Sequence, residues 1–238
     1  MREEFGPEYY RTHYSRRPNG WGARLEGDRP WQAIRISSLL KKARARRVLE
    51  VGCGLGFFLA RWDRRFDVVG VDVSSYAIRN AAHLAPNRFV AIADARTLPF
   101  KAAAFDAVLA FDVLEHISAP GRAVDDFARV LRPRGVLAFS VPNMDSIGRV
   151  LKGEQWHGKR DPTHCSLLTQ TEWSTFLAGG GFRPLKVWYD GLWDTPYFHG
   201  IPRTVQDALF KVPAIMASMI WTSPRSLGEN IFMLAVKE

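Results

Sequence analysis

The chain has 238 residues, of which 47% are apolar and 24% are charged, and its formal net charge is +9. This length supplies one large domain with a filled core, and the composition excludes a chain that is disordered throughout. The positive charge favours anionic partners, such as phosphate-bearing metabolites, nucleic acid or an acidic membrane surface, but does not bear on the fold. Two basic clusters, residues 41–47 and 61–65, are each either a solvated helix face or an anion-binding patch.

The chain contains two cysteines, Cys53 and Cys165. That number excludes a disulfide framework and a four-cysteine zinc site, and it fits a reducing compartment. No apolar run follows Met1, so we expect no secretory signal and a cytoplasmic location. The most apolar late segment, residues 212–221, is too short to span a bilayer. We therefore expect no transmembrane segment, while peripheral membrane contact stays open.

Helices and strands are predicted from the spacing of apolar residues, taken in chain order. After an irregular start, a helix is expected over 30–44. From there, short apolar runs alternate with helical stretches. The predicted strands are 48–51, 67–72, 88–93, 107–111, 135–141, 184–189 and 231–236, and the predicted helices between them are 57–62, 75–84, 121–131 and 171–178.

This alternation is typical of a mostly parallel sheet covered on both faces, because buried parallel strands are nearly continuous apolar runs. We expect an α/β, Rossmann-like, doubly wound fold with a seven-stranded sheet, helices on both faces and a last antiparallel strand. Ligand sites in such folds lie outside the carboxyl ends of the strands.

A glycine-rich turn follows the first predicted strand, in the run Val48-Leu49-Glu50-Val51-Gly52-Cys53-Gly54-Leu55-Gly56. Glycine lets the backbone approach a ligand closely, and the turn presents amides at a helix start. The dinucleotide fingerprint G-x-G-x-x-G fails in both frames, because Phe57 and Leu59 stand where its third glycine is required. The pattern therefore argues against a nicotinamide dinucleotide, with a purely structural loop as the alternative.

The pattern E-x-G-x-G-x-G in this turn resembles motif I of the class I S-adenosylmethionine-dependent methyltransferases. Further matches follow in chain order: Asp72 and Asp94 at the ends of the second and third strands, D-V-L-E-H-I at 112–117, and L-R-P-R-G-V-L at 131–137. Arg134 departs from the family, which has glycine there. The resemblance covers about residues 46–142 and is closest to the small-molecule branch that includes the quinone-biosynthesis methyltransferases. It implies a methyltransferase whose cofactor is S-adenosylmethionine.

The resemblance also implies roles for single residues. Asp72 would accept the ribose hydroxyl protons, which suits an acceptor-only carboxylate, and Asp94 would accept a hydrogen bond from the adenine amino group. Glu50 would orient the loop or the methionine ammonium, or is a buried acid satisfied by the turn. Cys53 is expected to pack rather than to act as a nucleophile. The expected cofactor-binding set is Glu50, Gly52, Cys53, Gly54, Gly56, Asp72, Val73, Asp94, Ala95, Phe111, Asp112 and Val113.

Methyl transfer from a sulfonium needs an aligned acceptor, excluded water and, for some acceptors, a base. His116 follows the fourth strand and His164 lies in the loop after the fifth. We predict that both are catalytic, as bases or acceptor-orienting groups; the alternative is a structural hydrogen-bonding role. No metal site is expected, because the spacing of His157, Asp161 and His164 matches no standard ligand motif.

The expected domain organisation is an N-terminal cap and helix, 1–45, and a methyltransferase domain, 46–238, with insertions at 143–170 and 191–229 on the substrate side. Aromatic residues in the cap, at the end of the strand 184–189 and in the second insertion either shape an acceptor pocket or simply pack: Tyr9, Tyr10, Tyr14, Trp188, Trp193, Tyr197 and Phe198. An apolar stripe at helical spacing either faces the core or docks on a membrane: Val205, Ala208, Leu209, Val212, Met216 and Ile220.

The sequence thus predicts a methyltransferase that methylates oxygen, nitrogen or carbon of a small molecule, anionic or lipophilic. One alternative is an RNA methyltransferase, which the basic charge favours. Against it, no RNA-binding module is recognisable and no N-P-P-[YF] motif follows the fourth strand. Another alternative is a non-catalytic subunit that binds S-adenosylmethionine for a partner enzyme. The acceptor and the oligomeric state are left open.

Overall fold

The computed structural model describes residues 5–14, 30–214, 216 and 223–238, without the side chains of 13–14 and 30–34. The described chain divides into two compact units. Unit 1 comprises residues 1–110 and 125–136, and unit 2 comprises residues 111–124 and 137–238. This division differs from the predicted boundary at 45/46, and the separate cap stays a prediction.

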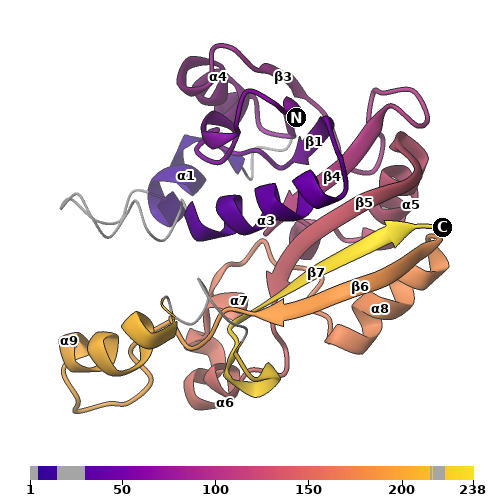
Figure 1. Cartoon of the computed structure of the whole chain (residues 1–238). Helices are drawn as coiled ribbons and strands as arrows, with labels where there is room; N and C mark the ends of the chain where they lie inside the picture. The colour runs from indigo at the N-terminus through magenta and orange to yellow at the C-terminus, as the bar shows by residue number, and fades with distance from the viewer. Residues whose placement is uncertain (1–4, 15–29, 215, 217–222) are drawn as a thin grey trace. The chain divides into compact units, whose positions relative to one another are not determined.

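A seven-stranded sheet has the strand order β3-β2-β1-β4-β5-β7-β6. β1 runs parallel to β2 and β4, β2 runs parallel to β3, and β6 and β7 are antiparallel. The predicted Rossmann-like α/β fold is therefore confirmed (Figure 1). The strands are β1 (Arg47–Val51), β2 (Asp67–Asp72), β3 (Phe89–Ile92), β4 (Phe105–Phe111), β5 (Leu131–Pro142), β6 (Phe182–Tyr189) and β7 (Asn230–Lys237).

The described helices agree with the predicted ones at four places and differ at one. The α-helices are α1 (Pro7–Tyr14), α3 (Pro30–Lys42), α4 (Ser75–Leu84), α5 (Pro120–Val130), α6 (Ile147–Lys152), α7 (His157–Arg160), α8 (Gln170–Gly179) and α9 (Arg203–Gln206). Shorter helical turns are η2 (Leu59–Arg61), η3 (Leu114–His116), η4 (Gly153–Gln155), η5 (Asp207–Lys211) and η6 (Arg225–Leu227). The predicted helix 57–62 is wrong: it shortens to η2, because Trp62 is extended at ψ 130°.

In unit 1, α4 packs along β2 and β3 (Figure 1). Ser74 caps this helix, because its hydroxyl accepts a hydrogen bond from the amide of Ala77. The buried face of α4 carries the small residues Ala77 and Ala81, which let other backbone come close. Gly56 does so: it has φ +85°, and a Cβ there would lie 2.8 Å from the Cα of Ala81. The third glycine of the turn is therefore required for packing.

The amino ends of the strands in unit 1 are held by one carboxylate. Asp106, at the start of β4, accepts hydrogen bonds from the amides of Arg46 and Arg47 at 2.6 and 2.9 Å and pairs with Arg132 at 3.0 Å. Its role is thus structural. Arg134, which stands where the resembled family has glycine, adopts φ +61°, the left-handed region that glycine tolerates best.

In unit 2, α8 packs on β6 (Figure 1). A capping box begins α8: Glu172 and Thr169 each bond the other residue's backbone amide. Trp173 on this helix is buried, with its ring centroid 5.7 Å from that of Phe139. The described part of the chain contains no helix long and apolar enough to cross a membrane.

We predict that Gly56→Ala lowers the free energy of unfolding by about 2–4 kcal/mol, because the added methyl group meets the backbone of α4 and the left-handed φ becomes strained. Urea denaturation followed by circular dichroism measures this. Gly179→Ala is the matched control, since a Cβ there has nothing within 4 Å. Equal stability of the two variants would contradict the packing role of Gly56.

Candidate functional site

The glycine turn of unit 1 is organised around the carboxylate of Asp72, at the end of β2. One carboxylate oxygen accepts a hydrogen bond from the amide of Gly54 at 2.9 Å, and the other accepts from the amide of Ser74 at 2.8 Å. Gly54 has φ +52°, so its amide is presented by a conformation that favours glycine. Asp72 therefore links the turn after β1 to the start of α4.

Asp72 is buried, and burial raises the pKa of its carboxyl, while the hydrogen bonds from Ser74 and Gly54 lower it. A carboxylate has four lone-pair positions, and the backbone bonds from Ser74, Gly54 and Val73 leave acceptor capacity. The side chain can therefore hold the turn and still accept hydroxyl protons from a ligand.

Glu50, on β1, is buried and accepts a hydrogen bond from the indole Nε1 of Trp62 at 3.0 Å. Burial raises the pKa of Glu50 to about 8, against smaller lowering effects of Trp62 and Arg88. The carboxyl is therefore largely protonated at neutral pH. The sequence analysis did not identify Trp62 as a partner of Glu50. Trp62 directly follows η2 with an extended backbone, and its contact with β1 has no local sequence signal.

Cys53 lies inside the turn with its side chain buried. Its amide bonds the carbonyl of Val71 at 3.0 Å, and a Cβ on Gly70 would lie 3.1 Å from its Sγ. Burial, and then the neighbouring Glu50 and Asp72, raise the pKa of the thiol. A thiol that stays protonated is a packing group rather than a nucleophile.

Asp94 follows β3 and forms an ion pair with Arg96. The guanidinium Nε and Nη2 of Arg96 contact its two oxygens at 2.9 and 2.5 Å, and the amide of Arg96 adds a third hydrogen bond. Ala95 beside it is buried and Val73 is half-buried. Because a carboxylate has four lone-pair positions, a role for Asp94 toward adenine stays a prediction, in which Arg96 orients the acid.

The N-terminal helix α1 packs on the glycine turn within unit 1. Tyr10 is buried, and its Cε1 lies 3.9 Å from the place of a Cβ on Gly54. Its ring centroid lies 5.7 Å from that of Tyr76 on α4. The hydroxyl of Ser74 donates to the carbonyl of Phe5 at 2.6 Å. Tyr10 therefore borders the turn that we expect to hold the cofactor; the side chain of Tyr14 lies outside the described part.

The predicted residues at the end of β4 belong to unit 2. Phe111, Asp112 and Val113 are half-buried, and Asp112 has φ +54°. Its carboxylate accepts a hydrogen bond from the hydroxyl of Ser140 at 2.7 Å, and its amide bonds the carbonyl of Ser140 at 3.1 Å. Ser140 therefore fixes this turn, and contact of these three residues with a cofactor stays a prediction.

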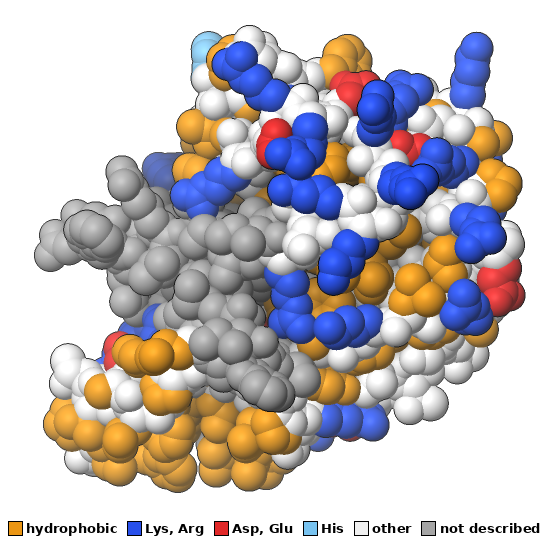
Figure 2. All heavy atoms as spheres, viewed as in Figure 1, with side chains coloured by type: hydrophobic (Ala, Val, Ile, Leu, Met, Phe, Trp, Pro, Cys, Tyr) orange, Lys and Arg blue, Asp and Glu red, His pale blue; other side chains and the backbone are white. Residues whose placement is uncertain are grey.

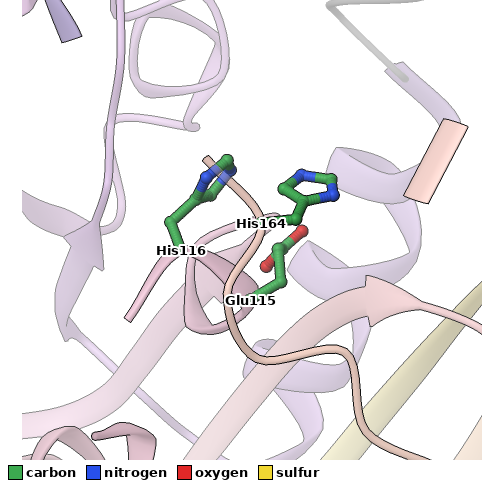
Figure 3. A group of neighbouring side chains, drawn as sticks. All are labelled: Glu115, His116 and His164. Carbon is green, nitrogen blue, oxygen red and sulfur yellow. The ribbon is translucent and has the colours of Figure 1, made fainter. Parts of the chain in front are cut away.

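His116 and His164 come together in unit 2, as Figure 3 shows. Their ring centroids lie 4.6 Å apart at an interplanar angle of 67°. His116 Nδ1 lies 2.8 Å from Thr163 Oγ1, and His164 Nδ1 lies 2.7 Å from the carbonyl oxygen of Gly158. Burial, and then the neighbouring His164, lower the pKa of His116 to about 4. His116 is therefore neutral at physiological pH.

The insertions 143–170 and 191–229 are joined by a buried carboxylate that the sequence analysis missed. Glu229 accepts hydrogen bonds from the Tyr197 hydroxyl and the Trp156 indole, both at 2.5 Å, and from the Ser146 hydroxyl at 3.3 Å. Burial raises the pKa of Glu229 to about 7. His157 Nε2 lies 3.2 Å from the carbonyl oxygen of Glu229. The contacts of His157 thus differ from those of the histidine pair.

Several residues of the expected aromatic set have packing roles. Trp188 is buried and stacks on Phe232 at 5.5 Å, and Tyr197 is buried against Glu229. Trp193 donates a hydrogen bond to Asp190 at 2.7 Å, while Phe198 is exposed. A pocket built from this set stays a prediction.

The apolar stripe of 205–220 does not face the core at its described positions, so the core-facing alternative is wrong there and docking on a membrane stays a prediction. Val205 is 45% exposed, Leu209 62%, Val212 50% and Met216 60%; Ile220 lies outside the described residues. Figure 2 shows apolar side chains gathered where Figure 1 draws α9.

The basic clusters lie on unit 1. Lys41, Arg44, Arg46 and Arg65 line a surface hollow together with Ala45 and Phe66. Figure 2 shows Lys and Arg side chains gathered over the region where Figure 1 draws the end of α3. Basic side chains from both clusters therefore converge on one hollow, at the amino end of β1.

Comparison with known proteins identifies the family of the chain. A methyltransferase domain family matches residues 25–187, more than half of the chain. A probable S-adenosylmethionine-dependent methyltransferase of Mycobacterium tuberculosis (strain CDC 1551 / Oshkosh) is 33% identical over 147 residues, which cover 60% of this chain and 51% of the relative. A ubiquinone biosynthesis O-methyltransferase of Alkalilimnicola ehrlichii is 32% identical over 132 residues, 53% of each chain. This chain thus spans about half the length of these curated relatives.

Among solved structures, an S-adenosylmethionine-dependent methyltransferase of Thermotoga maritima matches with a TM-score of 0.67 at 19% identity, covering all of both chains. At that identity the likeness shows the fold alone. The family match carries the assignment, and it confirms the resemblance that the sequence motifs indicated. The chain belongs to the methyltransferase domain family.

Proposed function

We propose that this protein transfers a methyl group from S-adenosylmethionine to a small-molecule acceptor. The observation that carries the proposal is the buried Asp72 carboxylate, which fixes the glycine turn and retains acceptor capacity. When bound, S-adenosylmethionine supplies an electrophilic methyl group on a sulfonium. The protein residues then have to bind the nucleoside, orient the acceptor and exclude water.

Within unit 1, each residue has a proposed part in cofactor binding. Asp72 accepts the ribose hydroxyl protons, and Asp94, oriented by Arg96, accepts from the adenine amino group. The turn at 52–56 brings main chain close to the methionine part, where Glu50 faces the ammonium. The family match and the buried acids at the ends of β2 and β1 support this assignment.

The histidine pair of unit 2 is assigned to the acceptor. His116 and His164 are neighbours, and the lowered pKa of His116 keeps it neutral, as a base has to be before it accepts a proton. We propose that the pair removes a proton from the acceptor or orients it.

A lipophilic acceptor is favoured by the exposed apolar stripe, since Val205, Leu209, Val212 and Met216 offer apolar side chains to a lipid-embedded molecule. The relative named for ubiquinone biosynthesis also supports a small-molecule acceptor.

An RNA substrate is the second candidate, and the basic hollow favours it. The hollow lies at the amino end of β1, whereas the glycine turn follows its carboxyl end. Five residues of strand span about 16 Å, so a small acceptor at the turn cannot also fill the hollow, but an extended polyanion can.

We predict that Asp72→Ala weakens S-adenosylmethionine binding at least tenfold in calorimetry, because a ribose partner and the anchor of the Gly54 amide are both lost. Asp67→Asn, at the exposed start of the same strand, is the matched control and keeps wild-type affinity. Unchanged affinity in Asp72→Ala would argue strongly against the cofactor assignment.

Glu50 gives a pH-dependent prediction. Its pKa of about 8 keeps the free carboxyl protonated at pH 6.5, where the ligand ammonium stays charged. A nearby ammonium lowers that pKa, so binding releases up to one proton, and affinity rises with pH up to about 8. Calorimetry at pH 6.5 in buffers of different ionisation enthalpy measures the release. Glu50→Gln is expected to release no proton on binding. Equal binding heats for the wild type in all buffers would mean that no proton is released, and Glu50 would then only orient the loop.

Incubation of the purified chain with methyl-labelled cofactor and separate lipid, soluble-metabolite and RNA extracts tests the reaction itself. We expect label in a small molecule of the lipid or metabolite fraction. Label in RNA that declines steeply with added salt would favour the second candidate, because phosphate contacts release counterions. Tight cofactor binding with no labelled product in any fraction would instead indicate a non-catalytic subunit.

A further inference from the structure

We propose that Glu115, His116 and His164 form a binding site for a divalent transition-metal ion of the zinc class. One donor atom from each residue lies within 4.8 Å of the donor atoms of the other two. Figure 3 shows the three side chains close together, Glu115 and His116 from one turn and His164 from a separate loop. All three belong to unit 2, so the proposal needs no part of unit 1.

The backbone holds the two segments together before any ion binds. The carbonyl oxygen of Glu115 accepts hydrogen bonds from the amides of Cys165 and Ser166, both at 2.9 Å. The hydroxyl of Ser166 donates to the carbonyl of Ile117 at 2.7 Å. These bonds hold the loop of His164 beside the turn of Glu115 and His116, so the donor atoms of the three residues are close together without an ion.

Hydrogen bonds also fix the tautomers of both imidazoles. His164 Nδ1 faces the carbonyl oxygen of Gly158 at 2.7 Å, and a carbonyl only accepts, so Nδ1 carries the proton. The hydroxyl of Thr163 donates to Asp161 at 2.6 Å and therefore accepts from His116 Nδ1 at 2.8 Å.

Nε2 is consequently the lone-pair nitrogen of each ring. Metal-ligating histidines usually donate the N–H of their other ring nitrogen to an oxygen acceptor. Both histidines do so here: His164 donates to a carbonyl, and His116 donates to a hydroxyl that is itself bonded to a carboxylate. Asp161, which orients Thr163, also lies 3.9 Å from His164 Nε2 and adds negative charge.

The donor set selects the class of ion. Two imidazole nitrogens and one carboxylate oxygen suit zinc and its first-row neighbours, whereas calcium and magnesium prefer oxygen donors alone. Glu115 is 1% exposed, and a buried carboxylate is stabilised by a cation beside it. Three protein ligands leave a coordination position for water or an oxygen of a bound molecule. With an ion bound, the histidine pair would orient an acceptor rather than take its proton.

This assignment departs from the sequence-based expectation of no metal site, which considered His157, Asp161 and His164. In the structure, His157 contacts Glu229 instead, and Glu115 contributes the carboxylate.

The test is a titration of the full chain, stripped with a chelator, by Zn²⁺ in calorimetry and by Co²⁺ in absorption spectroscopy. We expect one equivalent of Zn²⁺ to bind with micromolar or tighter affinity, a Co²⁺ spectrum of low coordination number, and a metal-dependent rise in Tm. Glu115→Gln and His164→Ala are expected to weaken Zn²⁺ binding at least tenfold. His83→Ala, which removes an exposed histidine on α4, is the matched control and leaves it unchanged.

No ion binding by the wild-type chain would overturn the proposal, and this outcome needs no variant to fold. Binding that survives in both Glu115→Gln and His164→Ala would overturn it as well, since the ion would then be elsewhere. Asp72→Ala separates this proposal from the proposed function: it is expected to lose cofactor affinity and keep Zn²⁺ affinity. Glu115→Gln is expected to lose Zn²⁺ affinity and keep cofactor affinity.

Discussion

Two hydrogen bonds to Asp72 organise the candidate cofactor site. The amide of Gly54 and the amide of Ser74 donate to the two oxygens of one buried carboxylate, and so the turn after β1 and the start of α4 share an anchor. The other features of this turn depend on that link. Gly56 packs against Ala81 because α4 begins where Asp72 holds it, and Tyr10 closes over Gly54.

Local signals explain how much could be predicted from the sequence. The strands of the sheet leave nearly continuous apolar runs, and the bounds of α4 followed from the helical stretch after Ser74, which caps it. The glycines and the acids at strand ends were found because they lie beside those runs. Arg134 was noticed as a departure from glycine, and its φ of +61° lies in the left-handed region that glycine tolerates best.

Long-range contacts explain what could not be predicted. Trp62 reaches Glu50, and Glu229 gathers Tyr197, Trp156 and Ser146, without any periodic pattern in the sequence. The same holds for the cluster of Glu115, His116 and His164, which depends on backbone bonds between residues about fifty positions apart. The surroundings of the apolar stripe could not be predicted either, because helical spacing alone does not tell whether an apolar face packs on the core or is exposed to solvent.

The central claim is that the Asp72-anchored turn holds the nucleoside of the methyl donor. Amide chemical shifts followed by NMR during titration with S-adenosylhomocysteine test it most directly. The account predicts that the largest shifts fall on Gly54, Ser74 and their neighbours. Saturable binding that leaves those two amides unmoved, with the largest shifts in another part of the chain, would contradict it.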